Sequence, residues 1–250
     1  MHEFPSHIVV SGIQLAILDV DDTLAHPTAS FERYYQTLYQ TELARRLHCS
    51  LEGTERLASY VGGRTEDLFE ADDLREIVGN VLPDLPFPDD VVTPLGRAAL
   101  YDVFATMDPA RYYRPDAELV ARLTAWRTRG IKLVVVTNTV RYNSEITLRK
   151  IGFDPGRDFD GYYPWERHHR VLPKIADPHG LYREILHEFG VAPGHAISIG
   201  DGVNDVLPAL DLGMYAGYVG NDADLRSRTH PRFYPTGHIR YIDLFPTADS

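Results

Sequence analysis

Acidic residues stand where the first apolar segment of the chain ends. Residues 15–18 form a short apolar run, which is typical of a buried strand, and Asp19, Asp21 and Thr23 follow directly. A carboxylate at such a strand end can attack a phosphoryl group. A second carboxylate two residues later can give a proton to the leaving oxygen and then activate water. The adjacent Asp22 is expected to have a structural role in the turn that follows.

Two later segments also change from apolar to polar at their ends. Residues 131–136 are a β-branched run, and residues 196–199 form a second short apolar strand. In an open parallel sheet the carboxyl ends of the strands meet at one edge, so the side chains that follow them should converge. These side chains are Thr137 and Asn138 after residues 131–136, and Asp201 and Asp205 after residues 196–199.

Converging carboxylates repel one another, and a bound cation relieves that repulsion. A ligand set made only of oxygen atoms favours Mg²⁺ over zinc, and Mg²⁺ commonly shares the oxygens of a substrate phosphate. Lys174 lies between the second and third strands in the sequence. A lysine and a threonine hydroxyl at the same edge would bind the oxygens of the transferring group and stabilise its charge.

The order of the predicted elements indicates an α/β protein with a Rossmann-like parallel sheet. Strands alternate with helices, which is typical of βαβ units with helices on both faces of the sheet. The core is expected to consist of residues 1–26 and 113–250, with a mostly helical insertion at 27–112. Within the core, helices are predicted at 116–129, 144–151, 178–189 and 203–210, and a last strand at 214–219.

Composition limits the possible partners and compartment. The chain has 250 residues and a net charge of −11, which argues against nucleic acid or an anionic membrane surface as the main partner. Cys49 is the single cysteine, and no segment has the pattern of a signal peptide or a membrane span. The charge does not exclude a phosphorylated small molecule, because a metal ion and a few local cations can override it. A cytoplasmic location is expected, and the sequence does not indicate the oligomeric state.

The polar segments resemble the four motifs of the haloacid dehalogenase superfamily, and they occur in the order found in that family. The first motif, Asp-x-Asp-x-Thr after a hydrophobic strand, is matched by Asp19, Asp21 and Thr23. The resemblance implies that Asp19 is the nucleophile and a Mg²⁺ ligand. It also implies that Asp21 is the general acid and base, and that the carbonyl of Asp21 contributes to the metal site.

The other motifs imply roles for the remaining polar residues. Thr137 would bind the phosphoryl group, whereas Asn138 would either contact the substrate or satisfy backbone groups. Asp201 would bind the metal directly, and Asp205 would bind it through water or support the other ligands. The family often places its lysine in a Lys-Pro-x-Pro setting, but here Pro178 follows Lys174 at a longer spacing. Lys174 is the best candidate for this cation, and Arg170 is the alternative.

The resemblance also implies a function for the whole chain. The insertion at 27–112 has the position of a helical cap that closes over the site and selects the substrate. We expect a Mg²⁺-dependent phosphatase that hydrolyses a small phosphorylated metabolite and is similar to phosphoglycolate phosphatases or nucleotidases. The alternatives are a phosphomutase, a haloacid dehalogenase and a non-catalytic binding protein on the same fold. Asp21 and Thr23 argue against the dehalogenase, and the intact set of acidic residues argues against a non-catalytic protein.

Overall fold

The computed structural model describes residues 7–27, 112–165 and 177–246. The chain divides into two compact units, Met1–His26 with Tyr113–Ser250, and Pro27–Tyr112. The helices predicted within 27–112, and the candidate cations Lys174 and Arg170, lie outside the described residues. The helical content and the capping role of 27–112 therefore stay predictions. Within the described residues, no helix is both long enough and apolar enough to cross a membrane.

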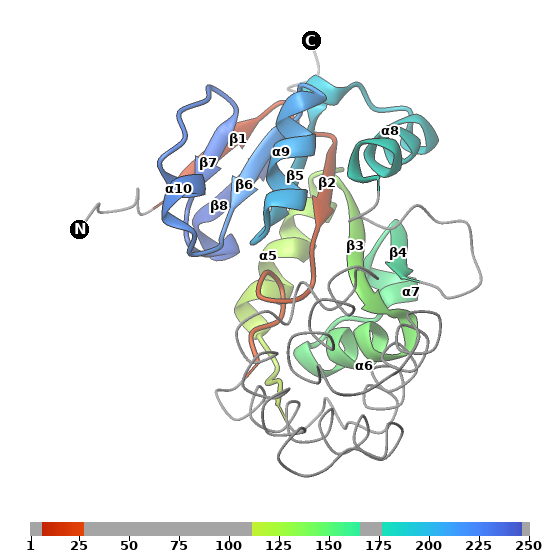
Figure 1. Ribbon diagram of the computed structural model, residues 1–250. Helices are drawn as coiled ribbons and strands as arrows, with labels where there is room; N and C mark the ends of the chain where they lie inside the picture. Colours follow the sequence, from red (N-terminus) through yellow and green to blue (C-terminus); the bar gives the residue numbers. More distant parts are fainter. Residues whose placement is uncertain (1–6, 28–111, 166–176, 247–250) are drawn as a thin grey trace, which may run out of the picture. The chain divides into compact units, whose positions relative to one another are not determined.

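The first unit is built on a six-stranded parallel sheet (Figure 1), which confirms the predicted fold class. Its strands run in the order β4-β3-β2-β5-β6-β7, so the first predicted strand, β2, lies at the centre. The strands are β2 (Leu15–Leu18), β3 (Lys132–Val140), β4 (Gly161–Trp165), β5 (Ala196–Gly200), β6 (Tyr215–Tyr218) and β7 (Phe233–Pro235).

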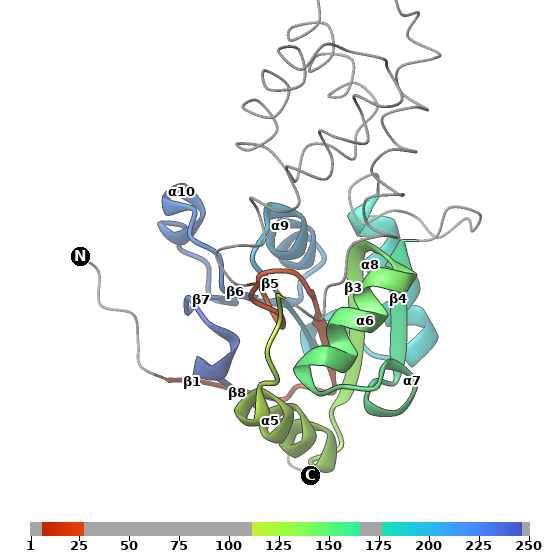
Figure 2. The same ribbon diagram turned by 90° about the horizontal axis from the view of Figure 1, so that it is seen from below.

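Helices cover both faces of this sheet, as Figure 2 shows. The helices α8 (Pro178–Phe189) and α9 (Val203–Asp211) lie on one face, and α5 (Ala117–Thr128) and α6 (Arg141–Ile151) lie on the other. All four side chains of β2 are buried. Leu15 and Ile17 belong to the apolar cluster under α8 and α9, because alternate residues of a strand point to opposite faces.

Local sequence signals set the ends of two helices where they were predicted. The side chain of Asp116 caps α5 by accepting a hydrogen bond from the Leu119 backbone N–H at 2.9 Å. Helix α8 begins with Pro178 in its first turn and ends at Gly190, whose φ of 63° lies in the left-handed region that favours glycine. These helices confirm the predictions for 116–129 and 178–189.

The junction between β3 and α6 differs from the prediction. The strand was expected to stop at residue 136 and the helix to begin at 144, but β3 continues to Val140 and α6 starts at Arg141. The register between β3 and β4 shifts between Val136 and Val140, so the end of β3 is an irregular strand rather than a loop. Thr137 and Asn138 therefore lie within this strand, as does Thr139.

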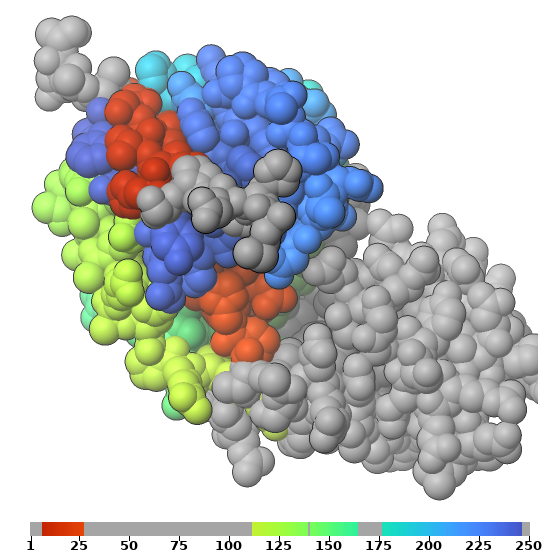
Figure 3. Space-filling view, turned by 90° about the vertical axis from the view of Figure 1, so that its left-hand side faces the viewer, coloured from red at the N-terminus to blue at the C-terminus, as the bar shows by residue number. Residues whose placement is uncertain are grey.

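A second sheet joins the two ends of the described chain. Strand β1 (Ile8–Ser11) pairs in parallel with β8 (Ile242–Phe245), and neither strand was predicted. Figure 3 shows N-terminal residues in red lying against C-terminal residues in blue on this face. Asp243 of β8 fixes this sheet to α5 by accepting hydrogen bonds from Trp126 Nε1 at 3.1 Å and Arg129 Nη1 at 2.6 Å. Short elements complete the unit: α7 (Pro155–Asp158), η3 (Pro193–His195), α10 (Ala223–Arg226) and η4 (Ile239–Tyr241).

Candidate active site

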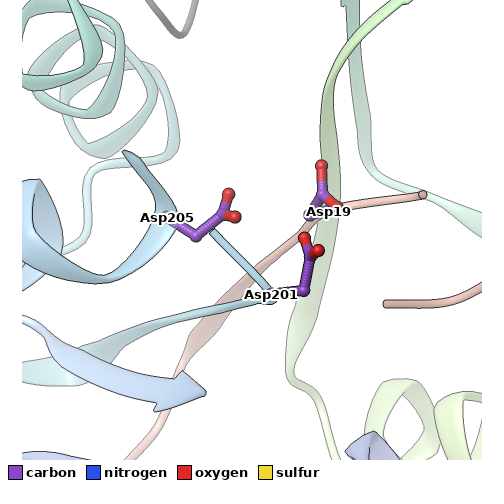
Figure 4. Close-up of side chains that lie close together, drawn as sticks. All are labelled: Asp19, Asp201 and Asp205. Atoms are coloured by element: carbon purple, nitrogen blue, oxygen red, sulfur yellow. The ribbon is translucent and has the colours of Figure 1, made fainter. Parts of the chain in front are cut away.

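Three aspartates meet at the carboxyl edge of the sheet, where the ends of β2 and β5 lie side by side. The pairing of β2 with β5 continues past the strand end, because the Asp19 backbone N–H donates to the Ile199 carbonyl at 3.0 Å. This places Asp19 beside the turn that carries Asp201. One ligand atom from each of Asp19, Asp201 and Asp205 lies within 4.8 Å of the others. Figure 4 shows the three carboxylates directed towards a common space.

The backbone between β5 and α9 holds Asp205 in this group. Asp205 lies in the first turn of α9, and its Oδ2 accepts a hydrogen bond from the Gly202 backbone N–H at 3.0 Å. The carboxylate packs directly against Gly200, where a Cβ atom would lie 2.1 Å from Asp205 Cγ. Any side chain at position 200 would force the Asp205 carboxylate to move, so glycine at this position keeps Asp205 in the site.

A buried pair of hydroxyl groups, from Tyr182 and Ser198, connects the same turn to helix α8. The Tyr182 hydroxyl of α8 lies 3.0 Å from Ser198 Oγ of β5 and donates to the Asp205 carbonyl at 3.5 Å. The Tyr182 and Ser198 side chains are buried. Buried hydroxyls need partners, and these two satisfy each other while connecting α8 to the start of α9.

The neighbouring strand β3 surrounds Asp21 with hydroxyl groups instead of carboxylates. Thr139 Oγ1 donates a hydrogen bond to Asp21 Oδ2 at 2.6 Å, and Thr137 Oγ1 donates to the same oxygen at 3.4 Å. Thr137 Oγ1 in turn accepts from the Thr139 backbone N–H at 3.0 Å. The Asp21 carboxylate therefore lies on the β3 side of the edge, and its side chain is not part of the group formed by Asp19, Asp201 and Asp205.

The loop that carries Asp21 is a tight turn. The backbone N–H groups of Thr23, Leu24 and Ala25 all donate to the Val20 carbonyl, at 3.4, 3.0 and 2.8 Å. Asp22 is exposed and has a φ of 53°, a left-handed conformation that aspartate tolerates better than most residues. This position agrees with the structural role expected for Asp22.

Tyr113 directly follows the insertion in the sequence and is influenced by the charges of Asp21 and Asp22. Its side chain is buried. Burial raises the pKa of its phenol well above the ordinary value, and the negative charges of Asp21 and Asp22 raise it further, whereas a hydrogen bond with Thr147 acts in the opposite direction. The phenol therefore stays neutral beside the two carboxylates.

The acidic group has the chemistry of a site for a hard cation. Asp19 and Asp205 are 7% and 3% exposed, so water screens their charges poorly. Two unit charges about 5 Å apart, close to the spacing of these carboxylate oxygens, repel by roughly 3 kcal/mol at an effective dielectric constant near 20. All three groups offer carboxylate oxygen and none offers sulfur or imidazole nitrogen, so the residues fit a cation such as Mg²⁺.

The structure thus brings together most of the residues singled out from the sequence. Asp19, Asp201 and Asp205 form one group, while Asp21 and Thr137 are linked by a hydrogen bond. Asn138 lies half-buried in β3 between the two threonines. Thr139 was missed, because the strand was predicted to end before it. Its spacing of two residues from Thr137 was the available signal, since such residues share one face of a regular strand.

Comparisons with known proteins agree with this fold. The family model of haloacid dehalogenase-like hydrolases matches residues 13–213, which confirms the resemblance found in the motifs. No curated protein is significantly similar to the chain in sequence.

Several solved structures share the fold at low sequence identity. A haloacid dehalogenase-like hydrolase from Bacteroides fragilis has a TM-score of 0.60 at 17% identity, covering 88% of this chain and 96% of that one. CbbY from Rhodobacter sphaeroides, in complex with xylulose-(1,5)-bisphosphate, has a TM-score of 0.55 at 18% identity, covering 93% and 100%. A β-phosphoglucomutase from Clostridium difficile has a TM-score of 0.51 at 15% identity, covering 86% and 87%.

Proposed function

The chain belongs to the haloacid dehalogenase-like hydrolase family, and from this premise we propose that it is a Mg²⁺-dependent phosphatase. Its substrate would be a small phosphorylated metabolite, and its reaction would pass through an aspartyl-phosphate on Asp19. The observation that carries the proposal is the division of the sheet edge into two parts. Three carboxylates gather on one part, and a fourth carboxylate, that of Asp21, lies against two threonine hydroxyls on the other.

In the first step, a carboxylate oxygen of Asp19 attacks the phosphorus atom and the bond to the leaving oxygen breaks. Asp21 gives its proton to that oxygen, so the product leaves as an alcohol. Thr137 donates to an oxygen of the phosphoryl group. Its hydrogen bond to Asp21 is long, at 3.4 Å, so the hydroxyl can turn to the substrate at little cost.

In the second step, water attacks the phosphorus of the aspartyl-phosphate. Asp21, now a carboxylate, takes a proton from that water, and the Asp19–phosphorus bond breaks to release inorganic phosphate. The sum of the two steps is one ester and one water converted to one alcohol and one phosphate. The same residue serves as acid and then as base, which requires that it stays beside the reacting oxygen in both steps.

Asp19, Asp201 and Asp205 would hold the Mg²⁺ ion. When bound, the ion supplies positive charge that neutralises the clustered carboxylates and the phosphoryl oxygens. This lets two anionic partners, Asp19 and the phosphate ester, approach each other. Lys174, or Arg170 in its place, is proposed as a further cation for the phosphoryl group.

Two of the structurally similar proteins support a phosphorylated small molecule as substrate. CbbY is described with a bound sugar bisphosphate, and another of these proteins is a β-phosphoglucomutase. The second of them also makes phosphomutase activity the competing proposal. A phosphatase releases inorganic phosphate in proportion to substrate consumed, whereas a mutase returns an isomeric sugar phosphate.

The test is a panel of phosphorylated metabolites, each assayed with Mg²⁺ and with excess chelator. We expect release of inorganic phosphate from at least one compound with Mg²⁺, none with chelator, and none from Asp19→Asn. Conversion of a sugar phosphate to an isomer without stoichiometric phosphate would favour the mutase. Substrate binding without turnover, in protein with Mg²⁺ bound, would contradict both proposed activities, phosphatase and phosphomutase.

A further inference from the structure

We infer that Thr139 is a positioning residue that holds the carboxyl group of Asp21 in place for proton transfer. The inference rests on the proposed function, because it assigns a role within that reaction. No motif identified in the sequence includes Thr139, and its contact with Asp21 emerges only from the fold of β3.

The hydrogen bond from Thr139 to Asp21 is the shorter of the two that reach this carboxylate from β3. Thr139 Oγ1 lies 2.6 Å from Asp21 Oδ2, whereas Thr137 Oγ1 lies 3.4 Å from the same oxygen. Hydrogen bonds to ionised groups are shorter and stronger than those between neutral groups, and 2.6 Å falls in the range of a hydroxyl donating to a carboxylate.

Thr139 also fixes the second hydroxyl of this pair. Its backbone N–H donates to Thr137 Oγ1 at 3.0 Å. That bond occupies a lone pair of the Thr137 oxygen and directs its proton outward, towards Asp21 or towards a bound phosphoryl group. One residue therefore orients two groups that the reaction needs, and it does so from the irregular end of β3.

The two threonines have different tasks once a substrate is bound. Thr137 turns its proton to the phosphoryl oxygen, which removes the weaker of the two hydrogen bonds that reach Asp21 from β3. Thr139 keeps the stronger bond, so the Asp21 carboxyl retains its orientation during both proton transfers. Without this bond the Asp21 side chain would be held less tightly, and a smaller part of the population would reach the leaving oxygen.

The experiment compares Thr139→Val and Thr139→Ser with the wild-type protein on two kinds of phosphate ester. Valine keeps the β-branched shape and removes the hydroxyl, while serine keeps the hydroxyl. One ester is p-nitrophenyl phosphate, whose leaving group departs without a proton. The other is the alkyl monophosphate with the highest kcat/KM in the metabolite panel, whose leaving group needs one. The value of kcat/KM reports the first step alone, in which the leaving group departs.

We expect Thr139→Val to lower kcat/KM for the alkyl phosphate by about 10-fold, the upper end for a hydrogen bond between neutral groups, because Asp21 is protonated in the step that kcat/KM reports. The value for p-nitrophenyl phosphate should stay within about 3-fold, and Thr139→Ser should recover most of the alkyl activity. The matched control is Thr124→Val on α5, because Thr124 is exposed and donates only to the Val120 carbonyl, at 2.7 Å. It should behave as wild type on both esters.

Two outcomes would overturn the inference while leaving the proposed function intact. In the first, Thr139→Val is as active as wild type on both esters. In the second, it loses activity equally on both, which would assign Thr139 to folding or to phosphoryl binding. Failure of the proposed function is distinct, because the wild-type protein itself would then release no phosphate.

Crystal structures of the two variants test the positioning without any turnover. The Asp21 carboxyl group should leave its wild-type orientation in Thr139→Val and keep it in Thr139→Ser. An unchanged Asp21 in the valine variant would contradict the inference whatever reaction the protein catalyses.

Discussion

Two parts of the same sheet edge handle negative charge in opposite ways. The acidic side consists of Asp19, Asp201 and Asp205, whose carboxylates lie together within 4.8 Å. The hydroxyl side consists of Thr137 and Thr139, which both donate to Asp21. On the acidic side three carboxylates repel one another, and a cation would relieve that repulsion even though Asp205 also accepts a backbone hydrogen bond from Gly202. On the hydroxyl side a single carboxylate accepts hydrogen bonds from two threonine side chains.

This difference matches the two kinds of chemistry in the proposed reaction. A phosphoryl group carries negative charge into the site, so the nucleophile has to share a cation with it. The acid and base has to change protonation twice, so its carboxyl group belongs outside the group of carboxylates that would bind the cation. Substitutions that affect one side and spare the other should therefore separate metal binding from proton transfer.

The largest effect is expected for Asp19→Asn, which removes the nucleophile from the acidic side. Turnover should fall by on the order of 10³-fold or more, because no alternative attacking group remains. In the absence of metal the variant should melt at a higher temperature than wild type, since one of three repelling charges is gone. Phosphate release and thermal unfolding with chelator measure the two effects. Wild-type turnover would contradict the covalent mechanism.

Removal of Lys174, the cation proposed to bind the phosphoryl group, is expected to have the next largest effect. Lys174→Ala should lower turnover by roughly 10²-fold to 10³-fold, comparable to the loss of one group that stabilises transition-state charge. Arg170→Ala is the matched comparison and should change turnover little. The reverse result would assign the role to Arg170.

Asp201→Ala tests whether the acidic side is the metal site. The Mg²⁺ concentration for half-maximal activity should rise by about 10-fold to 100-fold or more. The rise in melting temperature that Mg²⁺ gives to wild type should shrink accordingly. Thr139→Val, which alters the hydroxyl side, should keep the wild-type response to Mg²⁺. Equal Mg²⁺ responses in Asp201→Ala and wild type would remove Asp201 from the ligand set.

Gly200→Ala should weaken the acidic side through shape alone. The added Cβ would lie 2.1 Å from Asp205 Cγ, so the Asp205 carboxylate has to move. We expect a loss of about 1–3 kcal/mol in the free energy of unfolding, as for other overpacked sites, together with weaker Mg²⁺ binding. Gly156→Ala is the matched control, since the nearest atom to its Cβ would be 3.7 Å away. Chemical denaturation and Mg²⁺ titration check both expectations.

The smallest effect is expected for Tyr182→Phe beneath the acidic side. Loss of the Tyr182 hydroxyl removes its hydrogen bond with Ser198 Oγ, which should reduce the free energy of unfolding by about 1 kcal/mol. Turnover should change by less than about 3-fold, because the bond to the Asp205 carbonyl is long, at 3.5 Å. The double variant with Ser198→Ala should recover part of the loss, as both polar partners are then absent. A large drop in turnover would mean that Tyr182 holds Asp205 more firmly than its distance implies.

The sequence predicted the parts of the fold that are coded locally. The apolar run at Leu15–Leu18 became the central strand β2, and Pro178 and Gly190 mark the two ends of α8 as expected. Such signals act within a few residues, through burial and backbone conformation, so they can be recognised without knowing the rest of the structure.

The missed elements depend on distant partners. Strand β1 pairs with β8, more than two hundred residues away, and its local signal is only the short β-branched run of residues 8–10. Strand β4 contains Pro164 and pairs with β3 alone at the edge of the sheet, where proline is tolerated. The same limit applies to Thr139, whose contact with Asp21 depends on how β3 ends beside β2.

Identification of the residue that receives the phosphoryl group tests the central claim most directly. Rapid acid quench of the wild-type protein with Mg²⁺ and its best substrate, followed by peptide mass spectrometry, would locate the modification. The account predicts a phosphoryl adduct on the peptide containing Asp19, absent from Asp19→Asn and absent with chelator. An adduct on another residue, or turnover with direct transfer to water and no adduct, would contradict it.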